Sequence, residues 1–402
     1  MDPVSNPYAP GAGQRPPELA GRDTELAAFD VVLERVVRAR SERSMMLTGL
    51  RGVGKTVLLN ALRSAAVRAG WGTGKLEARP DQSLRRPLSA ALHVALRELG
   101  GRQDASDHVL GVLKSFALKG PAQAKLRDRW QPGIEVASVP GRADSGDIEI
   151  DLIELFSDAG GLAQEVGRGI AVFIDELQDL GAADVSALCA ACHELSQNGL
   201  PLIVVGAGLP HLPAVLSASK SYSERLFRYS RIDRLDRPAA DRALQAPARE
   251  CSAEFTVAAL DELYALTAGY PYFVQAYGKV VWDLAPRSPI TAADVAMAAP
   301  EAAAELAVGF FGSRLERATP AEREYLHAMA AAAPASLVDE PESVATAAVA
   351  ELLDRKPQSL SPARDALLKK GLIYSGERGR IAFTVPHFGH YLRTQQADSL
   401  AD

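Results

Sequence analysis

This chain of 402 residues has little cysteine, no long apolar run and no excess of positive charge. Its three cysteines fit a reducing compartment. No stretch approaches about 18 uninterrupted apolar residues, and the N-terminus lacks the charged-then-apolar layout of a secretion signal. These two absences argue against a membrane protein and predict a cytoplasmic one.

The charge balance argues against a second class, that of strongly basic proteins that bind nucleic acid. The 44 Lys and Arg residues stand against 50 Asp and Glu residues, which gives a formal net charge of −6. A chain of that charge is not, as a whole, a polycation drawn to nucleic acid. Large repeat arrays are missing too, which argues against a sensor built from repeats.

What is present is ordinary for a soluble globular protein, with 47% apolar and 23% charged residues. The length is too great for one compact core and predicts two or three domains. Cys189 and Cys192 form a C-x-x-C motif. The alanine-rich helical pattern around them favours two thiols that face a core.

The most informative segment is the octapeptide GLRGVGKT, from Gly49 to Thr56. It follows a short apolar run and precedes a helical pattern, as a phosphate-binding loop requires. Its glycines let backbone amides turn toward a phosphate chain, Lys55 supplies a positive charge, and the Thr56 hydroxyl can bind magnesium. A chance glycine-rich turn is the alternative. The predicted nucleotide-binding residues of this segment are Gly49, Leu50, Arg51, Gly52, Val53, Gly54, Lys55, Thr56 and Val57.

A second segment supplies carboxylates. The apolar run 170–174 is bounded by Gly169 on one side and by Asp175 and Glu176 on the other, which predicts a buried strand of a parallel sheet. Asp175 would hold magnesium through water, and Glu176 would act as the general base that polarises the attacking water. An Asp-Glu pair alone is typical of a solvated helix start. Next to a buried strand and a phosphate loop, it predicts ATP hydrolysis with ATP and Mg²⁺ as cofactors.

The rest of the chain divides into segments of different pattern. The proline-rich residues 1–17 are predicted to be a mobile tail. An ATPase core follows over 18–237, with an insertion at about 80–168 and further core strands at 75–78 and 202–205. Inside the insertion the pattern predicts helices at 84–99, 106–118 and 148–166 and a strand near 134–139. Residues 238–317 form a predicted helical lid and linker. Residues 318–396 form a predicted winged helix-turn-helix, with helices at 320–332, 343–354 and 361–370 before a two-stranded ribbon.

Together these elements resemble the AAA+ superfamily, on the branch shared by STAND-type signalling ATPases, archaeal-type ATPases and origin-initiator ATPases. The resemblance covers residues 18–396. It implies an α/β fold in which a P-loop core with a parallel sheet carries a helical lid and a C-terminal winged helix.

The resemblance also implies roles for single residues. Gly21 and Arg22 are similar to an element that precedes the phosphate loop and walls the adenine pocket in these families. Arg225 lies in a segment that looks like the arginine-finger region, and Pro271 belongs to a Gly-x-Pro motif like that of STAND proteins. If Arg225 is a finger, the active form is an ATP-dependent homo-oligomer. Alternatively, Arg225 is a solubilising arginine. Neither sensor residue of the family pattern is found, which implies slow hydrolysis and a switch rather than a motor.

Two functions remain open for such a switch. In the first, the winged helix binds duplex DNA and ATP controls oligomerisation. The charge of 355–393 favours this function, since eight Lys and Arg residues stand there against two acids. In the second, the winged helix is an autoinhibitory latch and the output is protein binding. A third and weaker possibility is an enzyme that remodels a partner protein. The DNA-binding candidates are Arg364, Lys369, Lys370, Arg378 and Arg380.

Overall fold

The computed structural model describes residues 1–40, 42–119, 134–333, 343–375, 377–385 and 387–401. The chain divides into two compact units, each of which is described here by itself. The sheet unit consists of Asp23–Thr48 and Leu58–Arg231. The helical unit consists of Met1–Arg22, Gly49–Val57 and Ile232–Asp402.

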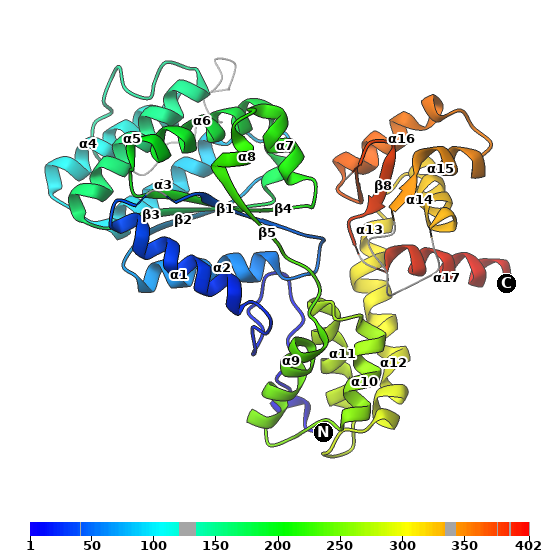
Figure 1. The fold of residues 1–402 in the computed structure, drawn as a ribbon. Coiled ribbons are helices and arrows are strands. Elements are labelled where there is room, and N and C mark those ends of the chain that lie inside the picture. The colour runs from blue at the N-terminus through cyan, green and yellow to red at the C-terminus, as the bar shows by residue number, and fades with distance from the viewer. Residues whose placement is uncertain (41, 120–133, 334–342, 376, 386, 402) are drawn as a thin grey trace. The chain divides into compact units, whose positions relative to one another are not determined.

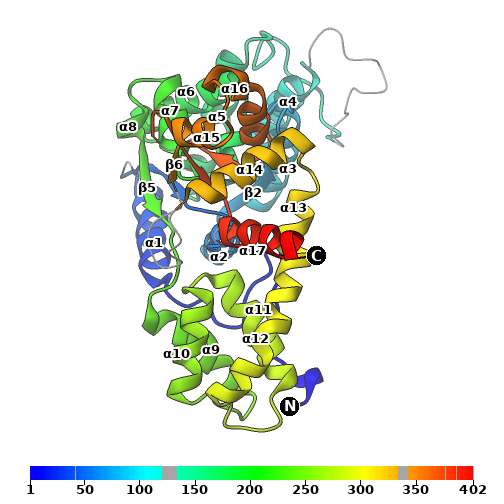
Figure 2. The ribbon, with the colours of Figure 1, turned by 90° about the vertical axis from the view of Figure 1, so that its right-hand side faces the viewer.

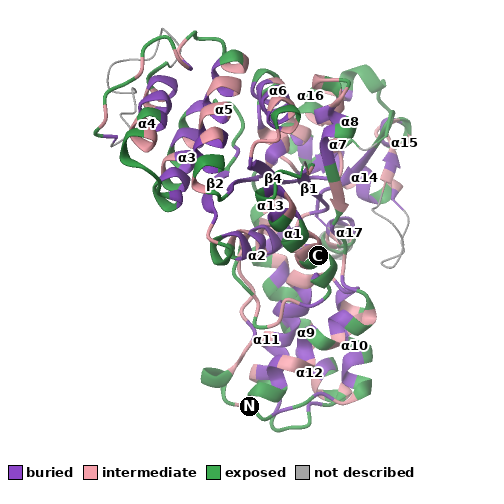
Figure 3. Ribbon diagram, turned by 60° about the vertical axis from the view of Figure 1, so that its left-hand side comes forward, coloured by how far each residue is buried: buried purple, intermediate pink, exposed green. Residues whose placement is uncertain are grey.

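A five-stranded sheet with the order β2-β3-β4-β1-β5 is the centre of the sheet unit (Figure 1). All four strand pairs are parallel. Residues of β1, β3 and β4 are buried along their whole length, which explains why their sequences are apolar runs without alternation (Figure 3). The strands are β1 Ser44–Thr48, β2 Gly72–Glu77, β3 Ile170–Asp175, β4 Leu202–Gly208 and β5 Phe227–Arg231.

Helices cover both faces of this sheet. α1 and α2 lie on one face and α3 to α6 on the other (Figure 1). Parallel neighbours need such crossover connections, so the alternation of strands and helices in the sequence already required two covered faces. The helices of this part are α1 Asp23–Val37, α2 Lys55–Arg68, α3 Arg85–Leu99, α4 Gln103–Leu118, α5 Ile148–Val166, α6 Ala182–Asn198, α7 Leu212–Ser219 and α8 Ser223–Leu226.

The bounds of two predicted core strands need correction, and one strand of the sheet was not predicted. β2 begins at Gly72, before the predicted start. β4 runs on through Gly208, beyond the predicted end at residue 205. Glycine inside this strand leaves room for a neighbouring side chain, because a Cβ on Gly206 would lie 2.5 Å from the Sδ atom of Met46. The sequence also missed β5, whose residues FRYSR alternate poorly because it is an edge strand with exposed arginines.

The segment between β2 and β3 is helical, with the predicted helices present as α3, α4 and α5. The predicted strand near 134–139 is wrong, since these residues are irregular. Residues 120–133 of the predicted insertion lie outside the described residues. A buried ion pair ties the segment together, with Arg85 Nη2 2.8 Å from Asp151 Oδ2.

The first residues of the helical unit are packed, so the prediction of a mobile tail at 1–17 is wrong. Tyr8 is buried, and its hydroxyl donates to the Leu244 carbonyl at 2.5 Å. Trp282 Nε1 donates to the Asp2 carbonyl at 2.9 Å. The N-terminus accordingly lies beside α11 and α12 (Figures 1 and 2). Prolines and glycines indicate an absence of regular structure, but a single buried aromatic residue can still anchor such a segment.

The lid consists of α9 Arg237–Glu250, α10 Val257–Thr267, α11 Pro271–Leu284 and α12 Ala292–Leu306. α12 continues through a π-helical turn, η4 Ala307–Gly312, into α13 Ser313–Leu315. By length and composition alone, Ala292–Leu315 is the one described helix apolar enough to cross a membrane, with a mean hydropathy of 1.3. That is weak evidence, because a core helix passes the same test, and this helix buries Phe310 and Phe311.

The C-terminal domain follows, and we use this name for residues 320–401. Its order of elements is α14 Pro320–Ala332, β6 Ser343–Ala345, α15 Thr346–Leu352, α16 Pro357–Lys369, β7 Ile373–Tyr374, β8 Arg380–Phe383 and α17 Phe388–Ala401. The three strands form an antiparallel sheet in the order β6-β8-β7. The sequence predicted the helix at 320–332 and the ribbon, started the third helix four residues too late, and missed β6 and α17.

Candidate nucleotide site

The phosphate loop joins two elements of the sheet unit. It leaves the C-terminal end of β1 at Thr48 and enters α2, whose first residue is Lys55. Gly52 and Gly54 have φ values of +84° and +91°, which side chains rarely tolerate. Apart from Gly54 itself and its two chain neighbours, no described atom lies within 4 Å of the place where a Cβ on Gly54 would stand. The backbone therefore forms an open cradle, and its shape fits a phosphate group.

Lys55 lies inside this loop. Its side chain is buried, and Nζ donates to the Leu50 carbonyl at 2.8 Å. Such a buried ammonium group is suited to a phosphate, since hydrogen bonds between two charged groups are roughly twice as strong as neutral ones.

Three segments of the helical unit hold the loop from outside. Arg22 Nη2 donates to the Val53 carbonyl at 3.0 Å and to the Asp233 carbonyl at 2.6 Å. The amide of Tyr272, next to Pro271, donates to the Gly52 carbonyl at 3.3 Å. A Cβ on Gly49 would lie 2.1 Å from the Ile232 carbonyl oxygen, so only glycine fits there. Of the residues that the sequence singled out, Arg22 thus contacts the loop, and Pro271 precedes the residue that does.

The carboxylates belong to the sheet unit. Asp175 is the last residue of β3 and is 6% exposed. Glu176 follows with φ +50° and ψ +41°, a left-handed conformation that is uncommon for a residue with a side chain. The Glu176 amide donates to Asp175 Oδ1 at 3.0 Å. Strain of this kind is retained where the surroundings hold it in place, and it is concentrated at functional sites.

Gln178 is a residue of this site that sequence reasoning missed. Its Nε2 donates to Glu176 Oε2 at 2.8 Å, and its Oε1 accepts from the Leu209 amide at 3.0 Å. The Glu176 carboxylate is therefore tethered to the end of β4 through one amide side chain. A Cβ on Gly208 would lie 2.7 Å from Gln178 Oε1, so the glycine that ends β4 makes room for this tether. The only sequence signal was a polar residue soon after the carboxylates.

The topology determines which edge of the sheet carries the chemistry. β1 and β3 run parallel with β4 between them, so their C-terminal ends lie at the same edge. The phosphate loop starts at that edge after Thr48, and Asp175 ends there. Ligands of open parallel sheets bind outside these ends. The residue types fit a nucleotide with Mg²⁺: Thr56 and Asp175 would hold the metal, and phosphate oxygens would supply the other ligands. No cluster of three or more His, Cys, Asp or Glu side chains among the described residues could hold a metal unaided.

Arg225 lies away from that edge. It is an exposed residue of α8, immediately before β5, and β5 starts beside Ser44 at the N-terminal edge of the sheet. Within one sheet unit Arg225 and Asp175 are therefore at opposite edges.

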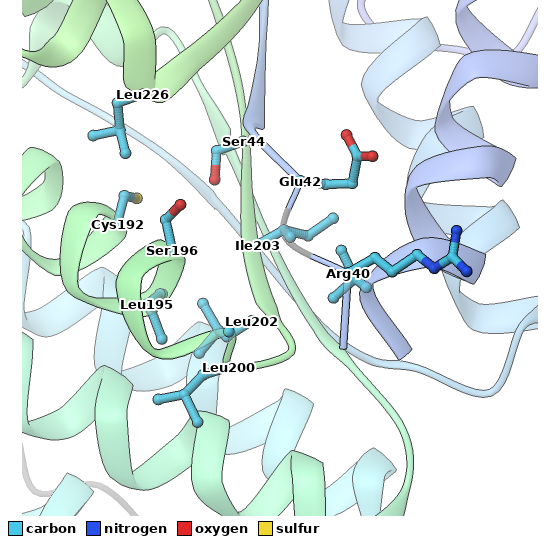
Figure 4. A pocket seen from close by; sticks show the side chains of 12 residues that line it. Arg40, Glu42, Ser44, Cys192, Leu195, Ser196, Leu200, Leu202, Ile203 and Leu226 are labelled. Carbon is cyan, nitrogen blue, oxygen red and sulfur yellow. The ribbon is translucent and has the colours of Figure 1, made fainter. Parts of the chain in front are cut away.

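A small cavity of about 20 Å³ also lies at the N-terminal edge (Figure 4). Ser44, Cys192, Ser196, Leu202 and Leu226 are among its lining residues. That volume holds one water molecule and no nucleotide. Burial raises the pKa of the Cys192 thiol and that of Cys189, the latter to about 12. Both thiols remain protonated, and the prediction of core-facing cysteines is confirmed.

Several of the predicted DNA-binding residues are engaged in contacts within the C-terminal domain. Arg364 pairs with Asp365 at 3.0 Å, and Lys370 Nζ lies 2.6 Å from Glu322 Oε2. Arg380 donates to the Ser343 carbonyl at 2.6 Å. Lys369 and Arg378 are exposed. The positive charge counted along the sequence is thus partly neutralised inside the C-terminal domain.

The fold and the site define a P-loop ATPase of the AAA+ type. Residues 18–205 match the family model of the AAA ATPase domain, and residues 308–392 match that of a domain of unknown function (DUF8462). The chain therefore carries an AAA ATPase domain and is an ATPase. None of the curated proteins matches it.

Solved structures resemble the chain at low sequence identity. The Walker-type ATPase PABY2304 of Pyrococcus abyssi is 17% identical with a TM-score of 0.56, over 94% of this chain and 97% of that one. This likeness shows a shared fold. The RuvB Holliday junction branch migration motor of Thermotoga maritima (17% identity, TM-score 0.43, 92% and 96% covered) is more distant. So is the ORC1 protein of Aeropyrum pernix, solved in complex with DNA (14% identity, TM-score 0.44, 96% of each chain). Scores this low do not establish a shared fold.

Proposed function

We propose that this ATPase is an ATP-controlled switch in which the C-terminal domain is held against the phosphate loop until nucleotide binds. One hydrogen bond carries the proposal: the Arg51 amide in the loop donates to the Thr384 carbonyl, directly after β8, at 2.9 Å. This is the latch that was the alternative to DNA binding, and it would work in the cytoplasm with ATP and Mg²⁺ as ligands.

Two further features support this contact. Gly371 has φ +62°, and a Cβ there would lie 2.9 Å from Arg51 Nη2, so glycine lets the guanidinium approach. The Thr384 hydroxyl donates to the Gly371 carbonyl at 2.7 Å and thereby fixes the end of β8 that presents the accepting oxygen. A loop whose backbone is engaged in this way must release the C-terminal domain if its amides are to turn toward phosphate.

Hydrogen exchange tests the switch directly. In the Glu176→Gln protein, which should retain ATP, addition of ATP and Mg²⁺ should speed exchange in the peptides of the C-terminal domain around Thr384 by about tenfold or more. The Lys55→Ala protein under the same conditions is the matched control and should not respond. Equal exchange with and without ATP in the Glu176→Gln protein would refute the switch.

We also propose that ATP drives self-association through Arg225. Its exposed place at the far edge of the sheet suits a residue that acts on the nucleotide of a second copy, since a guanidinium supplied in trans can raise the rate by about 10³–10⁵. Specific ATPase activity should then rise with protein concentration, and Arg225→Ala should abolish the rise. Arg228→Ala removes another exposed arginine nearby and should leave the rise intact. Constant activity per molecule across a hundredfold dilution would contradict this proposal.

Duplex DNA is the second candidate partner. Lys356, Lys369 and Arg378 are exposed, and none makes an ion pair with a described residue. If each contacts one phosphate, the logarithm of DNA affinity should fall with the logarithm of salt concentration at a slope of about −3. Replacing all three by Gln should bring this slope near zero.

The control for the DNA experiment replaces Arg364 and Arg380, which are engaged inside the domain, and should change the slope by less than about one. DNA binding that is undetectable at roughly 50 mM salt with ATP present would remove this candidate and leave the latch.

A further inference from the structure

A histidine joins the C-terminal domain to the lid. His387 lies just before α17, and its ring makes T-shaped contacts with Tyr270, at 5.6 Å between centroids, and with Phe273, at 5.2 Å. Between these two residues of the lid, Tyr272 donates its amide to the Gly52 carbonyl of the phosphate loop. One short segment of the lid therefore contacts both the loop and the C-terminal domain.

The backbone links this ring to the latch contact. His387 has a φ value of +60°, a left-handed conformation in which histidine is more frequent than most residues with a side chain. Its carbonyl accepts from the Tyr391 amide at 3.0 Å at the start of α17. Three residues earlier, the Thr384 carbonyl accepts from the Arg51 amide. Because the ring and the accepting carbonyl belong to one short stretch of chain, we expect them to leave the lid and the loop together.

The surroundings of the ring favour a neutral imidazole. Its Nε2 is buried and has no hydrogen-bond partner in the described part of the chain. Burial lowers the pKa of His387 to about 4, and the charges of His390 and Arg234 act in the same direction. His390 belongs to α17 and Arg234 to the segment before α9, whereas the other side of the ring faces the side chains of Tyr270 and Phe273. Both charged neighbours are basic, so neither would stabilise an imidazolium ion.

We propose that His387 makes the latch sensitive to acid: the C-terminal domain stays docked while this imidazole is neutral and is released when the imidazole gains a proton. A proton on the ring would place a charge between aromatic side chains without a counter-ion, which is costly when the group is buried. This regulation rests on the docking contact proposed above, but not on the response of that contact to ATP.

The direction and the range of the effect follow from proton linkage. The pKa of the docked ring lies below that of a free imidazole, which is about 6.5. The contribution of His387 to docking is therefore complete above about pH 6.5 and is lost as the pH falls toward 4. At pH 5.5 about nine-tenths of free imidazoles carry a proton, whereas the docked ring remains neutral. The ratio of docked to released protein should accordingly be about tenfold lower at pH 5.5 than at pH 7.5.

Hydrogen exchange in the nucleotide-free protein tests this inference. The Arg51 amide is bonded to the Thr384 carbonyl in the docked state, so protection of the peptide that contains Arg51 reports docking. After correction for the intrinsic pH dependence of exchange, this protection should fall about tenfold between pH 7.5 and pH 5.5. In the His387→Asn protein, whose neutral side chain tolerates the left-handed backbone, the protection should change by less than about twofold. The matched control is His390→Asn, which removes an exposed histidine of α17 and should keep most of the response.

A second variant covers the case in which His387→Asn weakens docking at every pH. His387→Phe restores an aromatic ring without a titratable group, so it should recover protection at pH 7.5 and lose the response to acid.

The outcomes separate this inference from the ATP switch. Equal protection of Arg51 at both pH values in the unmodified protein, or a full response in His387→Asn or His387→Phe, would overturn the acid sensitivity. An equal loss of protection in the peptides of α10 would also overturn it, because that loss would indicate general unfolding in acid. If acid releases the contact but ATP leaves exchange around Thr384 unchanged in the Glu176→Gln protein, the acid sensitivity stands and the ATP switch is refuted.

Discussion

The Lys55→Ala protein is expected to lose measurable affinity for both ATP and ADP, by about 100-fold or more in Kd. Lys55 is buried, and its ammonium group donates to the Leu50 carbonyl within the loop. Without it the phosphate chain would meet the backbone dipoles of the loop but no buried ammonium group. Equilibrium titration with fluorescent ATP and ADP measures the loss.

The control for this experiment is Lys279→Ala, which removes a lid lysine from a half-exposed pair with Asp283. Its nucleotide affinity should match that of the unmodified protein, since exposed pairs contribute little. An unchanged Kd in Lys55→Ala would show that the loop does not bind the phosphates.

The Glu176→Gln protein is expected to bind ATP and Mg²⁺ with unchanged affinity and to lose turnover by about 10²–10⁴-fold. The amide has nearly the same shape as the carboxylate but cannot accept a proton from the attacking water. Single-turnover hydrolysis combined with a binding titration separates the two effects. Full turnover in this protein would mean that another group is the base.

Gln178→Ala refines that experiment. Gln178 holds the Glu176 carboxylate by a 2.8 Å hydrogen bond without being placed to accept a proton itself. We expect an intermediate loss of turnover with unchanged ATP affinity, and Gln178→Asn should recover less than full turnover because its shorter side chain cannot span Glu176 and the Leu209 amide at once.

The sequence by itself was enough to predict which segments carry the candidate ATPase site. The loop Gly49–Val57 must lie between a strand and a helix because these three segments are contiguous, and their residue types allow few other structures. The run 170–174 is apolar throughout, so it had to be a strand buried on both faces, with Asp175 at its C-terminal end. Parallel strands then bring their C-terminal ends to one edge, which is why a local pattern was enough to predict loop and carboxylates together.

Only the tertiary structure decided what depends on partners far away in the chain. Tyr8 is ordered because it reaches Leu244, and β5 is a strand because β1 offers it an edge. The local sequence around Tyr8 and around β5 does not indicate these contacts with Leu244 and β1.

For the same reason, the number of cationic residues in the sequence differs from the number of cations that the fold leaves available for binding. Arg364 and Lys370 count as cations along the chain, but an acid carboxylate neutralises each of them in the fold. A motif can be recognised in the sequence because its residues are neighbours along the chain. Tethers, docking contacts and charge neutralisation depend on side chains that meet only after folding.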